Sequence, residues 1–444
     1  MPSQMLARVH PYRTLLTTFA AWKLFLFTIV LGCNFVGDTY DTSAGLVVRT
    51  GHHAGVDGSA DSWPGLVARL SSWDAIYFLS IARRGYRFEQ EWAFGGGLPI
   101  VVRTLVKGLA YLGIAGFSTV QEEEGAVLEA LTGIVVANAA HLLSALVLYR
   151  LGQLVWRDRA LSLVAAILHI LSPAGLFLSA PYAESSFALL SFSGYLFLAL
   201  SCRAERSPTS RDIYTILAGI LFGLATTFRS NGILNGIPFA WEVLCQLPRL
   251  HQRPSDTLRR LLALGIGGVC VAAGSIVPQA LAYLRFCSDT SGAEPRSWCR
   301  GYLPSIYTFV QKHYWHSGFL RYWTVSNLPL FLLAAPMLAV LVRSGVEQLR
   351  TDRRLSLTDK PAESARLLSL VRSAAAAQVL LAVLAVTMYH VQIITRISSG
   401  YPLWYWWLAG SLIRQDKSGS RIVTFMVMYA SIQGVLFASF LPPA

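Results

Sequence analysis

The sequence has few charged residues for its length. Asp, Glu, Lys and Arg make up 14% of the 444 residues, whereas soluble proteins have about a quarter. Hydrophobic residues make up 54% and the mean hydropathy is +0.48. Apolar runs of about 20 residues recur along the chain, and a soluble core cannot bury so many of them. The composition therefore predicts an all-α polytopic membrane protein, with residues 1–444 forming a single integral membrane domain.

Acidic residues are scarcer than basic ones. The chain has 24 Asp and Glu against 37 Lys and Arg, a formal net charge of +13. Nucleic-acid binding is one explanation for such a balance. The positive-inside rule explains it better, because Lys and Arg hold short loops on the cytoplasmic side of a membrane. We therefore expect no nucleic-acid partner.

Cysteine is sparse too, and several catalytic motifs are missing. There are six cysteines and no CxxC pair, so a zinc site is not favoured. Cys287 and Cys299 share one predicted lumenal loop and could form a disulfide in the secretory pathway; two unpaired thiols are the alternative. His313 and His316 lie three residues apart without an acidic cluster nearby, and we expect no metal site. The sequence also has no GxxxxGK[ST], HExxH, GxSxG or paired DxD motif.

The apolar runs predict eleven spans, with the N-terminus cytoplasmic and no recognisable cleavable signal. The spans are expected at about 14–36, 126–150, 160–179, 184–201, 213–228, 231–247, 261–284, 326–343, 371–390, from about 402, and 421–440. Every short Arg/Lys-rich loop, including 344–370, then falls on the N-terminal side. Two long lumenal loops remain, 37–125 and 285–325. Within the first, Arg103 and Lys107 interrupt an apolar run four residues apart, which predicts an interfacial helix lying flat.

Asp74 is the strongest candidate for chemistry. It lies in the first long loop beside aromatic and basic residues, where a water-facing carboxylate can take a proton from a sugar hydroxyl. A capping box with Ser71 as N-cap and Asp74 at N3 is the alternative explanation, and the two are compatible, since a helix N-terminus favours a carboxylate. Trp73 could stack on a sugar ring, although packing is the commoner use of such an aromatic.

Charged residues at the lumenal ends of spans are the next candidates. Glu184 begins a span, and an acid there usually faces a cavity or a partner; pairing with Arg229 is its structural alternative. Arg229 and Arg396 could each meet a phosphate through charge-assisted hydrogen bonds, with interfacial snorkelling as the alternative. His390 follows an apolar run and is more simply explained as a packing residue.

At these positions the sequence resembles the GPI mannosyltransferase II family. The first motif is Trp73-Asp74-x-x-Tyr77-Phe78-x-x-Ile81-Ala82-x-x-Gly85-Tyr86. Four more follow in order: Phe177 to Ser185, Thr227 to Gly232, Trp298-Cys299 with Tyr314 to Trp323, and Gln392 to Ser399. The resemblance covers about residues 70 to 408. The sequence departs from the family at Tyr77, where the family often has His, and at His316, where it often has Asn. It also has Gly95-Gly96-Gly97 in place of a family motif, and these glycines leave open how the chain enters the flat helix.

The resemblance implies a GT-C-like architecture of lipid-donor glycosyltransferases, with Asp74 as the catalytic acid residue of the large first loop. It implies inverting transfer of an α-1,6-linked mannose from dolichyl-phosphate mannose to the mono-mannosylated GPI precursor, without a cofactor or metal. The expected substrate-binding residues are Trp73, Tyr182, Glu184, Arg229, Asn231, Trp315 and Arg396. The implied location is the endoplasmic reticulum membrane with a lumenal active site, and a small accessory membrane subunit is a further candidate partner.

Two other functions remain open at this point. Another polyprenyl-phosphate-sugar transferase, such as a protein O-mannosyltransferase, would share the donor and differ in the acceptor. A lipid or sugar transporter is the alternative from another class. Transporters often show inverted repeats and broken helices near the midplane, whereas the flagged residues here cluster at one predicted membrane face and no repeat is visible.

Overall fold

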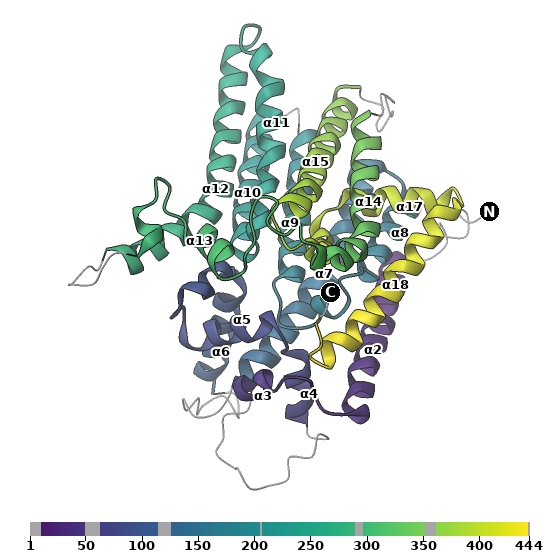
Figure 1. Ribbon diagram of the computed structural model, residues 1–444. Coiled ribbons are helices and arrows are strands. Elements are labelled where there is room, and N and C mark those ends of the chain that lie inside the picture. Colours follow the sequence, from purple (N-terminus) through teal and green to yellow (C-terminus); the bar gives the residue numbers. More distant parts are fainter. Residues whose placement is uncertain are drawn as a thin grey trace.

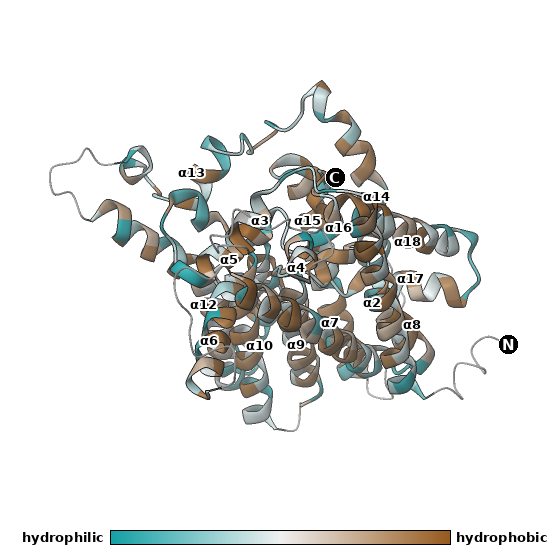
Figure 2. Ribbon diagram, turned by 90° about the horizontal axis from the view of Figure 1, so that it is seen from below, coloured by the Kyte–Doolittle hydropathy of each residue, from teal (hydrophilic) through white to brown (hydrophobic). Residues whose placement is uncertain are grey.

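The computed structural model describes residues 10–48, 63–113, 126–204, 207–288, 296–350 and 361–442, and in these ranges it is helical without strands (Figure 1). Eight helices are long and apolar enough to cross a membrane, and their ribbons are mostly brown in the hydropathy view (Figure 2). They are α2 (Pro11–Val36), α7 (Val127–Trp156), α9 (Glu184–Arg203), α10 (Pro208–Phe228), α12 (Pro254–Cys287), α14 (Leu328–Arg350), α15 (Pro361–Thr387) and α18 (Lys417–Ala438). The prediction of an all-α polytopic membrane protein is confirmed.

Three of the eleven predicted spans are shorter helices. The run at 160–179 forms α8 (Arg159–Ile170) and the 3₁₀ turn η2 (Gly175–Leu178), the run at 231–247 forms η3 (Ser230–Gly236) and α11 (Ile237–Gln246), and the run from 402 forms α17 (Leu403–Ile413). At 1.5 Å per residue, α8, α11 and α17 are each about 15–18 Å long, well short of a hydrocarbon core of about 30 Å. The count of eleven spans is therefore not confirmed.

A tertiary contact accompanies the break after α8. Gly175 has φ +50, and a Cβ there would lie 3.2 Å from the Cβ and carbonyl oxygen of Ala430. Glycine adopts this left-handed backbone without steric penalty, so the chain can turn closely against α18. The span predicted at about 160–179 is thus divided between α8 and η2.

Helices α14 and α15 extend into the interval 344–370, which was predicted to be a loop. Helix α14 continues to Arg350 and α15 already begins at Pro361. The last turns of α14 and the first turns of α15 carry charged residues, so the apolar runs used to predict the spans do not include them. The backbone can stay helical there, because long basic side chains extend toward the interface. The described parts of this interval therefore belong mainly to two helices.

The first long interval folds into short helices gathered at one end of the bundle, at the bottom of Figure 1. They are α3 (Ser43–Val48), α4 (Trp63–Leu70), α5 (Asp74–Arg84), η1 (Glu89–Ala93) and α6 (Gly97–Tyr111). Helix α6 buries Leu98, Val102 and Val106 while Arg103 and Lys107 are exposed. The amphipathic helix is confirmed; its orientation relative to a membrane stays a prediction.

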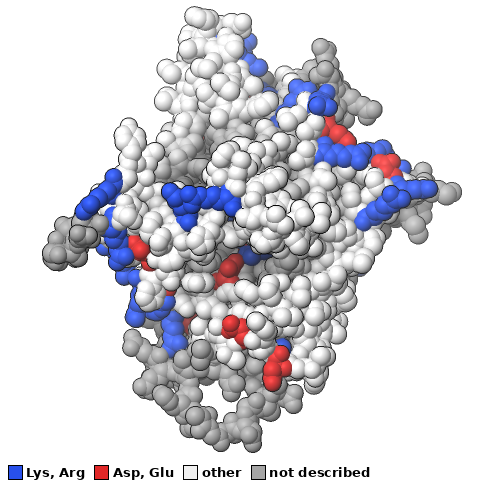
Figure 3. Space-filling view, in the orientation of Figure 1, with Lys and Arg blue, Asp and Glu red and all other residues white. Residues whose placement is uncertain are grey.

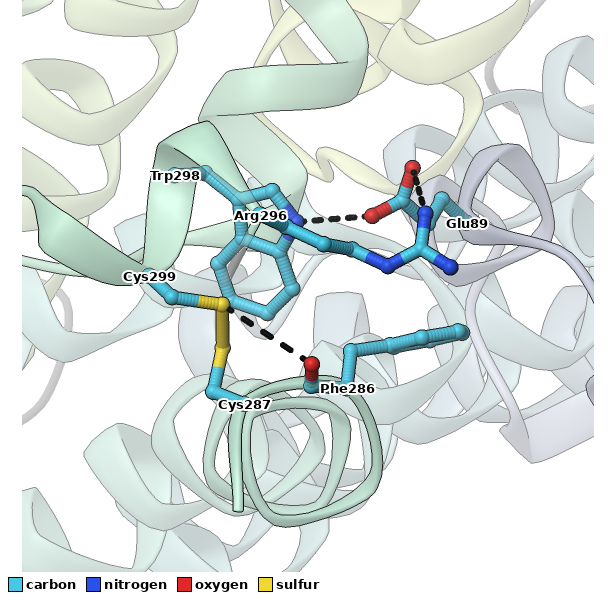
Figure 4. The surroundings of a disulfide bond; sticks show 6 residues. All are labelled: Glu89, Phe286, Cys287, Arg296, Trp298 and Cys299. Carbon is cyan, nitrogen blue, oxygen red and sulfur yellow. Dashed lines mark hydrogen bonds and ion pairs between the residues drawn. A yellow bond between two sulfur atoms is a disulfide. The ribbon is translucent and has the colours of Figure 1, made fainter. Parts of the chain in front are cut away.

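A disulfide and an acidic side chain fasten the second long interval. Cys287, at the end of α12, is bonded to Cys299, so the predicted pairing is present. Trp298 donates from Nε1 to Glu89 Oε1 at 2.8 Å, and Arg296 Nη1 lies 3.1 Å from Glu89 Oε2. Figure 4 shows these groups beside the sulfur pair. They tie η5 (Ser297–Arg300) to η1 and so position the following helix α13 (Ile306–His313).

Short helical turns connect α15 to α17. They are η7 (Val391–Ile393), α16 (Ile394–Ile397) and η8 (Ser398–Gly400). Ile394, Ile397 and the residues of η8 are buried, so protein surrounds this irregular chain, as the absence of water in a bilayer requires. The segment carries Arg396 into the interior near the first long interval.

Candidate active site

A cavity of about 460 Å³ opens where the short helices meet the ends of the long ones. Its walls come from six separate stretches of the chain: Trp73, Asp74 and Phe78; Ala93, Phe94 and Gly95; Phe228, Arg229, Ser230 and Asn231; Tyr307, Gln311 and Trp315; Tyr389, His390, Gln392, Ile393, Arg396 and Ile397; and Pro442. In the space-filling view, acidic and basic atoms lie together in a hollow near the middle of the face (Figure 3). The cavity thus combines aromatic walls with a few charged groups, as ligand sites do.

Asp74 is the first residue of α5 and lines this cavity. The predicted capping box is wrong: Trp73 is the N-cap, and Ser71 instead donates from Oγ to the Val67 carbonyl at 2.8 Å, completing the turn after α4. Trp73 has φ 61, a left-handed backbone that is costly for a non-glycine residue and recurs at functional sites. This turn places a carboxylate at the N-terminus of α5, where negative charge is favourable.

Two carboxylates and two guanidiniums form a connected ion cluster. Arg396 Nη2 lies 3.0 Å from Asp74 Oδ2 and 2.8 Å from Glu184 Oε1, and Arg229 Nη1 lies 2.6 Å from the same Glu184 oxygen. The Glu184 side chain is fully buried, whereas 38% of the Asp74 side chain is exposed. Asp74 is therefore the acid of this cluster that a ligand in the cavity can reach, and Glu184 holds the two arginines in place.

Aromatic rings support the buried side of the cluster. The Arg396 guanidinium lies over the Phe177 ring at 4.2 Å and the Tyr182 ring at 5.0 Å, a cation–π arrangement. Burial by itself lowers the pKa of Arg396, but the Glu184 and Asp74 carboxylates outweigh it and raise that pKa above its ordinary value. Arg396 is thus a permanent cation at the cavity wall.

Tyr182 was predicted to bind substrate, but it lies behind the cavity wall and is completely buried. Its hydroxyl donates to the Ser72 carbonyl at 3.0 Å, and this bond fixes the turn that leads into Asp74. Glu184 likewise does not line the cavity. Both residues hold cavity residues in position, and direct substrate contact is not supported for either one.

The other predicted residues do line the cavity. Trp73, Asn231 and Trp315 are part of its wall. Asn231 donates from Nδ2 to Tyr401 Oη at 3.3 Å, and Trp315 packs edge-to-face on Phe94 with ring centroids 5.4 Å apart. These contacts give the wall a fixed shape with an amide and two indoles.

Lys23 was missed by the sequence reasoning. This residue of α2 donates from Nζ to the Leu178 carbonyl at 3.0 Å and to Ser179 Oγ at 2.7 Å. Asn138 of α7 donates to the Ser179 carbonyl at 3.1 Å. Together they hold the chain between η2 and Glu184. A lysine inside the first apolar run was the available signal, because an ionisable residue within a span is rarely without a partner.

Three further residues of the cavity wall, Tyr307, Gln311 and His390, were not predicted as site residues. Tyr307 and Gln311 lie four residues apart on α13, a spacing that would have indicated one shared helix face. His390, interpreted above as a packing residue, lines the cavity as well. Burial lowers the pKa of His390 and so favours a neutral imidazole. A hydrogen bond with the Trp315 backbone and the Asp74 charge oppose this effect but do not cancel it.

No group of three or more His, Cys, Asp and Glu side chains suited to a metal ion occurs in the described ranges. The charged groups at the cavity are a carboxylate and two guanidiniums. This set can accept a proton from a hydroxyl and stabilise a phosphate.

The comparisons with known proteins agree with this chemistry. A family model described as "Mannosyltransferase (PIG-V)" matches residues 23–444. A protein named GPI mannosyltransferase 2 from Chaetomium globosum is 66% identical over 98% of this chain and 97% of its own length. Proteins of the same name from Gibberella zeae and Aspergillus oryzae are 46% and 41% identical, each over 98% of this chain and over 98% and 96% of their own lengths.

Among solved structures, an archaeal oligosaccharyltransferase from Archaeoglobus fulgidus aligns with a TM-score of 0.45 at 12% identity, over 93% of this chain. The alignment spans a little over half of that protein, 56%. This degree of likeness does not establish a common fold. The family match extends over nearly the whole sequence, and the chain therefore belongs to the PIG-V mannosyltransferase family.

Proposed function

We propose that this mannosyltransferase moves a mannosyl group from dolichyl-phosphate mannose to the mono-mannosylated GPI precursor, forming an α-1,6 bond. The observation that carries the proposal is the cavity in which Asp74 lies beside Arg396 and Arg229. The names of relatives up to 66% identical over nearly the full length support GPI as the acceptor class. The donor and the bond type follow from the resemblance of the five motifs.

The reaction is a single displacement that inverts the anomeric carbon. Asp74 accepts the proton of the attacking hydroxyl as a bond forms between that oxygen and C1 of the mannose. The bond from C1 to the phosphate oxygen breaks, and its electron pair leaves with dolichyl phosphate. Arg229 and Arg396 stabilise the growing negative charge on that phosphate, as fixed cations do best in a partly dry site. No metal takes part, so we expect transfer to survive EDTA.

The aromatic residues of the cavity wall can bind the sugar rings of the donor and the acceptor. Trp73 and Trp315 offer flat apolar faces of the kind on which sugar rings stack, and Asn231 offers an amide near Arg229. His390 adds a further polar group. We place the cavity on the lumenal side of the endoplasmic reticulum membrane, because the short Arg- and Lys-rich loops lie toward the other ends of the helices.

The experiment is to express the chain in cells that lack the second GPI mannose and to analyse their lipid-linked intermediates. We expect the one-mannose intermediate to be consumed and a two-mannose intermediate to appear. Persistence of the one-mannose lipid, with the chain present in the membrane fraction, would contradict the proposal. A peptide acceptor labelled in the same membranes, with the glycolipid unchanged, would identify a protein O-mannosyltransferase instead.

A further inference from the structure

A second cavity, of about 470 Å³, lies at the opposite end of the bundle from the active site. Arg211, near the start of α10, lines this cavity, whereas Phe228 at the end of the same helix lines the other. Seventeen residues of helix separate them, roughly 25 Å at 1.5 Å per residue. Ser201 and Cys202 of α9 line the second cavity, while Glu184 at the other end of α9 belongs to the active-site cluster. The two cavities thus lie toward opposite membrane faces.

Positive charge dominates this second cavity. Five arginines line it against two carboxylates: Arg211, Arg249, Arg253, Arg260 and Arg366, with Glu242 and Asp256. The carboxylates are already engaged, since Arg211 Nη2 lies 3.0 Å from Asp256 Oδ1 and Arg260 Nε lies 3.8 Å from Glu242 Oε1. Gln246 also donates from Nε2 to Glu242 Oε1 at 2.6 Å.

Arg249 and Arg253 are the two exposed arginines of this set. No ion pair in the described part of the chain engages Arg249 or Arg253. Arg260 is only 7% exposed and donates to Ser201 Oγ at 3.2 Å and to Thr215 Oγ1, so it is a fixed positive charge at the cavity wall. An excess of cations in a confined space attracts an anion, and the guanidinium fork matches phosphate oxygens in particular.

Apolar surface lies next to these arginines. Exposed leucines follow the chain on both sides of Arg249 and Arg253: Leu244, Leu247, Leu250, Leu258 and Leu262. A small adjoining hollow of about 20 Å³ shares Cys202, Glu242, Arg260 and Arg366 with the cavity, and its further lining includes Leu198, Trp241, Leu264 and Leu370. Guanidinium groups and apolar side chains are therefore neighbours at the ends of α9, α10, α11, α12 and α15.

We propose that this second cavity binds the headgroup of an anionic phospholipid in the leaflet opposite the active site. Its phosphate contacts Arg249 and Arg253, and its acyl chains lie along the neighbouring leucines. Basic pockets between membrane helices commonly bind such headgroups. A free phosphate ion shares the headgroup chemistry, but it would make no use of the adjoining leucines.

The test measures binding of dioctanoyl phosphatidylinositol 4-phosphate to the purified full-length chain in detergent, by native mass spectrometry and a titration. Dioctanoyl phosphatidylcholine and inorganic phosphate serve as comparison ligands. We expect the anionic lipid to bind at least about tenfold more tightly than either one, because only it combines phosphate monoester charge with acyl chains. The double variant Arg249→Gln with Arg253→Gln should weaken that binding at least about tenfold, since two charge-assisted contacts are lost.

Arg414→Gln with Arg421→Gln is the matched control, because these exposed arginines lie near the same ends of the helices but outside the cavity. Unchanged binding in the control, together with an unchanged melting temperature in both double variants, supports the cavity as the site. Equal binding by wild type and Arg249→Gln with Arg253→Gln would overturn the proposal. Equal affinity for inorganic phosphate, or for phosphatidylcholine, would overturn it too, by showing a soluble-anion site or non-selective lipid binding.

Discussion

Arg396 Nη2 lies 3.0 Å from Asp74 Oδ2, although the two residues are 322 positions apart in the sequence. The contact joins the first long interval to the segment between α15 and α17. Both residues were predicted on one side of the membrane from the apolar runs and the distribution of Arg and Lys. Their meeting in one cavity is what a shared active site requires.

Substitution of Arg396 tests whether one guanidinium must bridge two carboxylates. Arg396→Gln leaves the buried Glu184 with Arg229 alone, and breaking a buried pair costs about 3–5 kcal/mol, so we expect a lower melting temperature. Arg396→Lys keeps the charge but lacks the fork that contacts Asp74 and Glu184 together. It should remain folded and transfer mannose much more slowly.

Thermal unfolding in detergent and mannosyl transfer in membranes separate these effects. Arg300→Lys, at an exposed position of the second long interval outside the family motifs, is the matched control and should behave as wild type. Wild-type transfer rates in Arg396→Lys would show that the bridge is dispensable.

Gly95 tests the packing of the cavity wall on α10. A Cβ at this position would lie 2.3 Å from the Phe228 carbonyl oxygen, next to Arg229. Neither backbone can easily give way, so Gly95→Ala should destabilise the protein by about 1–3 kcal/mol and reduce transfer. The close approach also explains the unusual glycines before α6. A Cβ at Gly108 would have no atom within 4 Å. Gly108→Ala should therefore leave the stability unchanged or raise it by about 0.5–1 kcal/mol, because alanine is favoured over glycine inside a helix. Equal melting temperatures for the two variants would refute the packing.

The disulfide gives a direct chemical prediction. Trypsin cleaves after Arg285, Arg296 and Arg300, so under non-reducing conditions the peptide containing Cys287 should stay joined to the peptide containing Cys299. Mass spectrometry should find the joined mass, and reduction should release both peptides. Two free peptides in protein purified without reductant would show that the bond is absent. Cys202 and Cys270 are unpaired in the structure and serve as internal references for alkylation.

His390 predicts a pH dependence of stability. Its folded-state pKa is lowered from 6.5, mainly by burial, so the unfolded chain takes up the proton first as the pH falls. This contribution is complete above about 6.5 and is lost as the pH falls through 6.5 toward the folded-state pKa. His390→Gln should therefore have a flatter profile of melting temperature below pH 6.5 than wild type. Parallel profiles for the two proteins would contradict the assignment.

The parts that sequence predicted well depend on local patterns. Apolar runs located the long helices, and the spacing of Arg103 and Lys107 identified the exposed face of α6. What escaped prediction depends on distant contacts. The turn at Gly175 packs on Ala430, and Tyr182 turns away from the cavity to bond Ser72. No pattern near either residue carries that information. Glu184 was placed at the right end of its helix, but its simultaneous contact with Arg229 and Arg396 follows only from the fold.

The most direct test is mannosyl transfer by Asp74→Asn in membranes, compared with Asp38→Asn, a change at an exposed carboxylate on the same side of the bundle. Removing a general base typically costs about 100- to 10,000-fold in rate, and we expect a loss of this size for Asp74→Asn with unchanged expression and melting temperature. Asp38→Asn should transfer at the wild-type rate. Near-wild-type transfer by Asp74→Asn would contradict the assignment of Asp74 as the base.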